Sequence, residues 1–245
     1  MAEERDGPSP ASYIEQLEAQ LAAAGSARAQ TRARILLGVA QLLDADGYQD
    51  AIVRHVCERL GISRGAFYQY FENRTDAVAE VLNGFCRFVF EMSVGVGRGK
   101  SDFERINEVT YFYLQIYQRN KGLFAVQYKL AREKSVYSEG WRELQDKWRG
   151  RLAKYIVRVT EADDGALQSA LALSYMLTSL ADDFLYRLIF EDEEQLRWLR
   201  RHPRRVAALI SVVWYRAIFG RNPAAALEED FQLKYSGLLP IALVR

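Results

Sequence analysis

Apolar residues recur along most of the chain at intervals of three and four positions, which is the spacing of one face of an α-helix. The first such segment, residues 9–24, starts with a Ser-Pro pair suited to a helix N-terminus. Its apolar stripe consists of Ile14, Leu17, Leu21 and Ala24. A second helix is predicted over residues 26–46 and ends at a glycine. Its apolar face consists of Ile35, Val39, Leu42 and Leu43. No stretch alternates as a β-strand would, so the pattern predicts an all-α fold.

Two short helices joined by a tight turn are predicted next. Asp50 is suited to cap the first of them, and Gly61 is suited to the left-handed residue that ends it. Ser63 can cap the following helix only two positions after Gly61, so the two helices must cross steeply, as in a helix-turn-helix. The buried face of the first short helix consists of Val53, Val56, Cys57 and Leu60.

The second helix of such a pair lies in the major groove of DNA, and its residues divide into two groups. Phe67 and Phe71 are four positions apart on one side, so they are predicted to anchor the helix to the core. Gly65 lacks the side chain that would hold the backbone away from a phosphate. Tyr68 can donate a hydrogen bond to a phosphate, whereas Gln69 can bond to the edge of an adenine.

One contiguous run is similar to the DNA-binding signature of TetR-type transcriptional regulators: GYQDAIVRHVCERLGISRGAFYQYFENRTDAV, residues 47–78. The matching residues are Gly47-Tyr48, Val53-Arg54, Gly61-Ile62-Ser63, Gly65, Phe67-Tyr68, Tyr70-Phe71 and Arg74, where the family usually has lysine. The departures from the family pattern concern the cap of the first short helix and local packing. They are Ile52, Cys57, Leu60 and Ala77.

The resemblance implies an N-terminal helix-turn-helix DNA-binding domain, followed by a larger C-terminal helical domain for regulation and dimerisation. We therefore expect an N-terminal extension with an accessory helix at residues 1–25, a DNA-binding domain at 26–74, and a ligand-binding and dimerisation domain at 75–245. The expected DNA-binding residues are Arg28, Arg32, Arg54, Ser63, Arg64, Gly65, Ala66, Tyr68, Gln69, Tyr70 and Arg74.

A helix predicted over residues 75–92 connects the two domains, and the glycine-rich SVGVGRGKS ends it. Its apolar face consists of Val78, Val81, Leu82, Phe85, Val89 and Met92. The segments up to residue 155 are dense in aromatic side chains, which either form core or line an elongated apolar cavity with hydroxyl groups at its edge. The second interpretation predicts a small hydrophobic or aromatic effector. Its candidate ligand-binding residues are Tyr113, Tyr117, Phe124, Tyr128, Trp141, Trp148 and Tyr175.

The last two long helices, GALQSALALSYMLTSLADDFLYRLIF and PRRVAALISVVWYRAIFG, are apolar on almost every side. A helix of this kind must bury its second face on another surface. In TetR-like proteins the corresponding pair forms a four-helix bundle with its symmetry mate, so the resemblance implies a homodimer. Asp182 and Asp183 stand in this apolar context and require partners such as Arg187 or Arg216. The residues expected at the dimer interface are Leu171, Tyr175, Leu209, Val213 and Ala217.

Composition narrows the function further. The 245 residues have a net charge of +1, which leaves no overall electrostatic footprint for nucleic acid, so DNA binding must be local. With two cysteines, two histidines and no metal-ligand spacing, phosphate loop or nucleophile motif, the sequence predicts no metal, cofactor or catalytic site. The acidic start MAEERDGPSP is unlike a secretory signal, and no apolar run reaches the length of a membrane helix. We therefore expect a cytoplasmic protein without a membrane partner.

Three functions remain. The favoured one is a dimeric repressor that binds a near-palindromic double-stranded DNA operator and is released by the effector. The alternatives are a DNA-binding regulator controlled by a protein partner or by no ligand, and an enzyme whose helix-turn-helix is incidental. Two segments also have two interpretations each: the N-terminal helix is docked or is a frayed tail, and the basic run RWLRRHPRR is a solvated connection or a second nucleic-acid patch.

Overall fold

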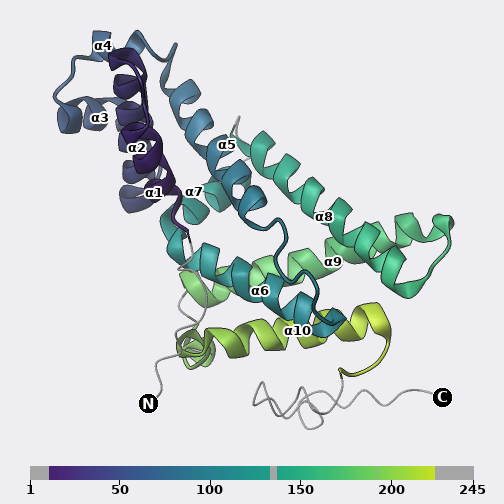
Figure 1. The fold of residues 1–245 in the computed structure, drawn as a ribbon. Coiled ribbons are helices and arrows are strands. Elements are labelled where there is room, and N and C mark those ends of the chain that lie inside the picture. Colours follow the sequence, from purple (N-terminus) through teal and green to yellow (C-terminus); the bar gives the residue numbers. More distant parts are fainter. Residues whose placement is uncertain (1–10, 133–136, 192, 224–245) are drawn as a thin grey trace. The chain divides into compact units, whose positions relative to one another are not determined.

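Helices make up the fold in the computed structural model, which describes residues 11–132, 137–191 and 193–223 (Figure 1). These residues contain no β-strand, and the predicted all-α fold is confirmed. The α-helices are α1 (Tyr13–Ala22), α2 (Ala27–Asp46), α3 (Ile52–Leu60), α4 (Arg64–Tyr68), α5 (Arg74–Met92), α6 (Asp102–Arg119), α7 (Lys121–Arg132), α8 (Ser138–Thr160), α9 (Leu167–Tyr186) and α10 (Pro203–Phe219). The shorter helical turns are η1 (Asp164–Ala166), η2 (Arg187–Glu191), η3 (Glu194–Leu196) and η4 (Leu199–Arg201).

The helices group into two compact units. The first unit contains the described residues within 1–92 and 115–146, and the second contains those within 93–114 and 147–245. Helices α6 and α8 therefore contribute their two ends to different units. The helix-turn-helix segment lies wholly in the first unit, whereas α9 and α10 lie wholly in the second.

Helix α1 begins later than the sequence pattern predicted. Its N-cap is Ser12, whose backbone N–H donates to the Glu15 carboxylate at 3.3 Å, whereas residues 9–10 lie outside the described part of the chain. The Tyr13 N–H donates to Oδ1 of Asn120 at 2.8 Å. Both bonds satisfy backbone donors that the first turn of a helix leaves without intrahelical partners, and they fix where α1 starts.

Helix α1 is docked within the first unit, where it lies along α2 and buries Tyr13 and Leu17 (Figure 1). The Tyr13 ring packs against Phe85 and Phe88 of α5, with centroid distances of 5.7 and 5.6 Å. At Gly84 of α5, an added Cβ would lie 2.1 Å from the Tyr13 hydroxyl oxygen. This close approach therefore requires glycine, and the burial of Tyr13 was not evident from the predicted apolar stripe.

The ends of the helix-turn-helix segment follow the sequence prediction with one exception. Ser63 Oγ accepts a hydrogen bond from the first turn of α4 at 3.0 Å, and Gly61 ends α3 with a φ of 64°. The predicted cap at Asp50 is wrong, because Ala51 occupies the N-cap position and its side chain offers no acceptor. The Asp50 carboxylate instead pairs with Arg74, whose Nη1 lies 2.9 Å away.

Helix α5 buries the predicted apolar face except at its last residue. Met92 is 40% exposed, so its predicted burial is wrong. The helix ends there, and the chain enters the glycine-rich loop, where Gly95 has a φ of 89°. The buried members of the predicted face are Val78, Val81, Leu82, Phe85 and Val89.

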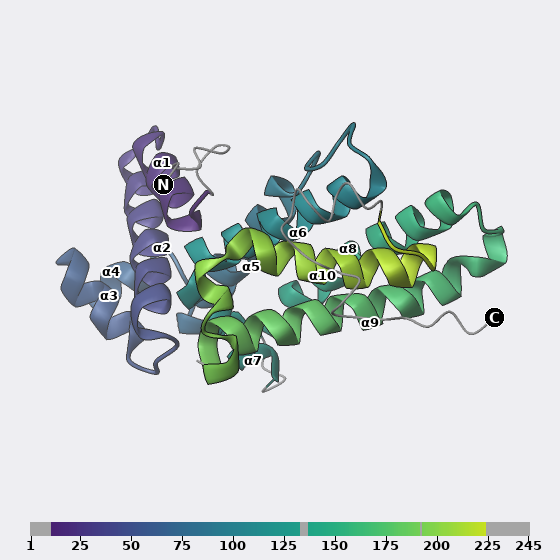
Figure 2. The same cartoon turned by 90° about the horizontal axis from the view of Figure 1, so that it is seen from below.

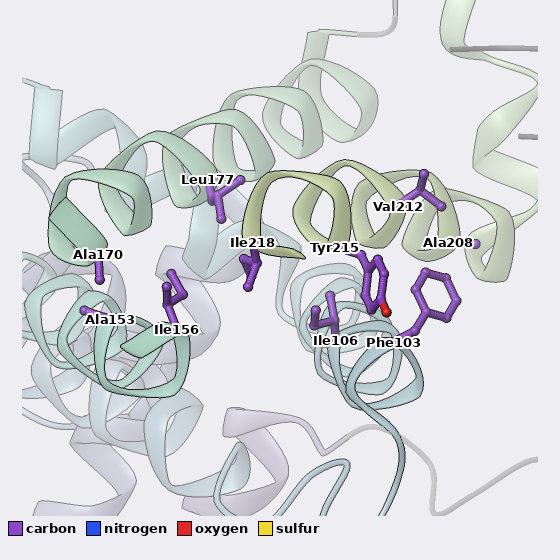
Figure 3. Packing of buried hydrophobic residues seen from close by; sticks show 10 residues of the cluster. All are labelled: Phe103, Ile106, Ala153, Ile156, Ala170, Leu177, Ala208, Val212, Tyr215 and Ile218. Atoms are coloured by element: carbon purple, nitrogen blue, oxygen red, sulfur yellow. The ribbon is translucent and has the colours of Figure 1, made fainter. Parts of the chain in front are cut away.

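The core of the second unit is contributed by four helices (Figure 3). The Phe103 ring of α6 meets the Tyr215 ring of α10 edge to face, with centroids 5.7 Å apart. Small residues allow the helices to approach each other, because Ala153 of α8 and Ala170 of α9 are both buried in this core. The other members of the cluster are Ile106, Ile156, Leu177, Ala208, Val212 and Ile218.

Helices α9 and α10 lie side by side in the second unit (Figure 2), and the two acidic residues of α9 are paired. Arg187 Nε donates to Asp183 at 2.8 Å, which is one of the predicted pairings, and the Tyr113 hydroxyl donates to Asp182 at 3.2 Å. Arg216 instead bonds to Asn222 at 2.7 Å. Helix α10 begins with Pro203, the first residue of the predicted segment PRRVAALISVVWYRAIFG.

Both cysteines are buried and reduced. Burial raises the pKa of the Cys86 thiol to about 12, which keeps it protonated. Within the described residues, no three or more acidic, histidine or cysteine side chains gather in a way that could hold a metal ion. No helix in the same part of the chain has both the length and the apolar character needed to cross a bilayer.

Candidate DNA interface and regulatory core

Helix α4 is anchored by one buried face and exposes the opposite face to solvent. Phe67 is 0% exposed, and its ring lies 5.5 Å from that of buried Phe71, as their four-residue spacing predicted. Tyr68 directly follows Phe67 and is 50% exposed, with its ring perpendicular to that of Phe67. The buried rings therefore fix the orientation in which α4 offers its polar side chains to solvent.

The polar face of α4 is open to an approaching molecule. Arg64, Gly65 and Gln69 are exposed, as is the capping Ser63. An added Cβ at Gly65 would meet only Ser63 Oγ, at 3.7 Å. The backbone here is thus uncovered, which is the arrangement expected if a phosphate approaches it closely. Ala66, by contrast, is half-buried.

A shallow groove joins the start of α2 to the end of α4. Arg28 and Thr31 line it from α2, and Gln69 and Tyr70 line it from the residues after α4. Arg28 was predicted at the interface, and the structure brings it next to Gln69. Thr31 was missed, although it lies three positions after Arg28 and therefore on the same helical face.

The predicted arginines differ in their surroundings. Arg32 Nη2 lies 2.5 Å from Glu80, and Arg54 Nε lies 3.9 Å from an acidic side chain one turn later in α3. Arg74 also donates to the Asp50 carbonyl oxygen at 3.1 Å. Among the described residues, neither Arg28 nor Arg64 forms an ion pair. Of the arginines predicted to bind DNA, these two are therefore the ones whose charge is not neutralised by a described residue.

Four of the aromatic residues predicted to bind a ligand come together in the first unit, and we call them the aromatic cluster: Tyr117, Phe124, Tyr128 and Trp141. All four are buried. The Tyr117 and Phe124 rings are stacked, with centroids 4.2 Å apart and an angle of 15° between their planes. Trp141 meets Tyr128 at 5.2 Å and Phe124 at 6.1 Å.

The other three predicted ligand-binding residues belong to the second unit. Tyr113 donates to Asp182, and Trp148 is half-buried on α8. Tyr175 is exposed on α9, and the Arg149 guanidinium lies over its ring at 4.1 Å.

Within the first unit, hydrogen bonds and a close backbone approach join α2 and the loop after it to α7 and to Tyr137, which precedes α8. Asp44 of α2 accepts from the Leu123 N–H of α7 at 3.0 Å, and a Cβ added to the neighbouring Gly122 would lie 1.8 Å from the Asp44 carbonyl oxygen. The hydroxyl oxygens of Tyr48 and Tyr137 are 3.3 Å apart. Burial, and then the hydrogen bond to Tyr137, raises the pKa of Tyr48 to about 12, so its hydroxyl stays neutral. Sequence reasoning missed these contacts, because they join distant positions.

Helix α9 exposes an apolar face. Met176 is 62% exposed, and the other large exposed apolar side chains of the helix are Leu167, Leu171, Tyr175 and Leu180. On α10, Leu209 and Val213 are half-buried and Ala217 is exposed. Large apolar side chains gathered on one helix face normally mark a surface that another molecule covers.

The steeply crossed α3 and α4, with buried phenylalanines behind an exposed polar face, define a helix-turn-helix DNA-binding protein. Residues 35–81 match the family model described as "Bacterial regulatory proteins, tetR family". The resemblance seen in the sequence is thereby confirmed over residues 35–81, which carry the helix-turn-helix DNA-binding domain of that family. Comparison with curated proteins gave no match.

Proposed function

We propose that the protein is a homodimeric repressor that binds a near-palindromic operator and releases it when a largely hydrophobic effector binds. The observation that supports DNA reading most directly is the groove in which Arg28 lies beside Gln69 and Tyr70. It combines a cation for the phosphate backbone with an amide suited to a base edge. Arg64 and Tyr68 extend this surface along α4.

Selection from random duplexes tests operator binding. Paired recognition helices require half-sites about 34–36 Å apart or a multiple of that distance, so the enriched sequences should be symmetric. Gln69→Ala should cost on the order of 1–3 kcal/mol against the preferred base and little against other sequences. Arg28→Ala, the matched control, should weaken all duplexes alike and reduce the salt dependence of binding. Enrichment of no symmetric site contradicts the proposal.

The exposed apolar face of α9 and its neighbour α10 support dimerisation. Val213→Glu places a charge at a half-buried position of α10, where an interface cannot pair it. The variant should become monomeric in light scattering, whereas Gln20→Glu at an exposed position of α1, outside α9 and α10, should leave the mass unchanged. A wild-type monomer would rule out this part of the proposal.

The aromatic cluster supports an apolar effector over a small polar ion. The effector would act through its different affinities for the DNA-binding and released conformations, typically worth about 1–3 kcal/mol of coupling. Mass spectrometry of the purified protein tests for a copurified ligand. A copurified protein that alone releases the operator would instead favour control by a protein partner.

A further inference from the structure

Gln127 of α7 has a buried side-chain amide that lacks a hydrogen-bond partner among the described residues. Its side chain is 0% exposed, and neither Nε2 nor Oε1 has a hydrogen-bond partner among the described residues. The large majority of buried polar side-chain atoms in proteins are paired, because an unpaired one loses its bonds to water without replacement. An apolar side chain at this position would give a more stable fold, so packing alone does not account for a glutamine here.

The buried amide lies next to the aromatic cluster. Gln127 follows Phe124 by three positions in α7, and side chains at this spacing share one face of a helix. The Phe124 ring is stacked on Tyr117 and meets Phe85 edge to face at 5.0 Å. A donor and an acceptor are therefore placed beside flat apolar surfaces, which is the usual composition of a small-molecule site.

We propose that Gln127 is the polar anchor of the effector site and that the effector is uncharged, with a flat apolar body and one group that both donates and accepts hydrogen bonds. A carboxamide or lactam has this chemistry: its carbonyl oxygen accepts from Gln127 Nε2, and its N–H donates to Gln127 Oε1. A charged group is disfavoured, because a neutral amide cannot balance a buried charge. This assignment rests on the proposed function, in which the first unit receives an effector.

The site has a direct structural connection to the DNA-binding helices. Leu123, one turn before Gln127, is bonded to Asp44 of α2, and Gly122 lies in tight contact with the backbone at the same residue. Helix α2 carries Arg28 in its first turn. A ligand that shifts α7 as it pairs with Gln127 therefore shifts α2, and with it the groove that reads DNA.

Gln127→Met tests the anchor, because it keeps the length of the side chain and removes both polar atoms. Two probes are titrated into the full-length wild type and variant: naphthalene-2-carboxamide, and 2-isopropylnaphthalene as its apolar counterpart. Without probe, the variant should unfold at a Tm about 2–4 °C higher than wild type, because the unpaired amide is gone. It should bind the carboxamide about 5- to 150-fold more weakly, measured by the thermal shift.

Thr110→Val is the matched control, since it removes a buried hydroxyl of the second unit that is bonded to the Ile106 carbonyl at 2.8 Å. It should leave carboxamide binding unchanged. The proposal is overturned if Gln127→Met lowers the Tm, if it binds the carboxamide as wild type does, or if neither probe binds wild type. Because thermal shifts require no DNA, these outcomes are separate from a failure to select an operator, which would contradict the proposed function instead.

Discussion

The first unit contains two aromatic groupings that differ in what they bury. Behind α4, Phe67 and Phe71 bury only hydrocarbon, and the polar side chains of the helix face solvent. In the aromatic cluster, rings are equally buried, but the amide of Gln127 is buried and has no hydrogen-bond partner in the part of the chain that the structure describes. The first grouping maximises the stability of a five-residue helix that has little of its own. The second gives up stability, which the proposed effector would restore by pairing with the amide.

Phe67→Ala should have the largest effect, because Phe67 is the buried residue of α4 and its side chain is 0% exposed. We expect the free energy of unfolding to fall by about 3–5 kcal/mol in urea denaturation, and operator binding to be lost. Tyr68→Ala, at the neighbouring position that is 50% exposed, should change the free energy of unfolding by no more than about 0.5 kcal/mol. Equal destabilisation by the two changes would contradict the division between buried and presented sides of α4.

Gly122→Ala tests whether the two groupings are mechanically joined. The new Cβ would lie 1.8 Å from the Asp44 carbonyl oxygen, so α2 and α7 must separate, at a cost of about 1–3 kcal/mol. Release of the operator by the effector should weaken as well, while operator binding in the absence of effector should persist.

Gly150→Ala is the control for the change at Gly122. A Cβ added at this position in α8 meets nothing within 4 Å, and alanine favours the helix, so this variant should be as stable as wild type or more so. If both alanine variants unfold alike, the approach of α2 to α7 does not constrain the fold.

The reading helix could be predicted from sequence because its determinants are local. Gly61, Ser63 and the spacing of Phe67 and Phe71 each act within one or two helical turns, and the structure places all four as expected. The prediction for Asp50 failed for a non-local reason, since a distant arginine pairs with that carboxylate instead.

The part of the first unit formed by α6, α7 and α8 depends on contacts between distant positions, which no periodic sequence pattern can reveal. The aromatic residues of α6, α7 and α8 were identified, but their division between two units was not, because it depends on how long helices pack. Gln127 was missed altogether: a single glutamine in an amphipathic helix normally marks the solvent side. Its burial becomes visible only when the surrounding helices are in place.

Gly84→Ala should have a smaller effect than the change at Gly122, because the atom it meets is the end of a side chain. The Cβ would lie 2.1 Å from the Tyr13 hydroxyl oxygen but 3.2 Å from the ring carbon that bears it. We expect a loss of about 1 kcal/mol and faster amide exchange over α1, as the helix loosens. Adding Tyr13→Phe removes the clashing oxygen and should restore slow exchange. Rapid exchange over α1 in wild type would favour a frayed N-terminal helix.

Tyr68→Phe should have the smallest effect. It tests operator affinity with the least change in the free energy of unfolding. The hydroxyl is removed from a ring that is 50% exposed, so the free energy of unfolding should stay unchanged in urea denaturation. Operator binding should weaken by about 1 kcal/mol, the net value of one hydrogen bond, and by the same amount for the preferred and for altered duplexes, because a phosphate contact carries no sequence information. A loss confined to the preferred duplex would instead assign the Tyr68 hydroxyl to a base edge, and an unchanged affinity would place Tyr68 outside the DNA contact. In either case the exposed residues of α4 would be assigned differently to phosphate contacts, base contacts and positions outside the interface. The assignment of the buried residues would not change.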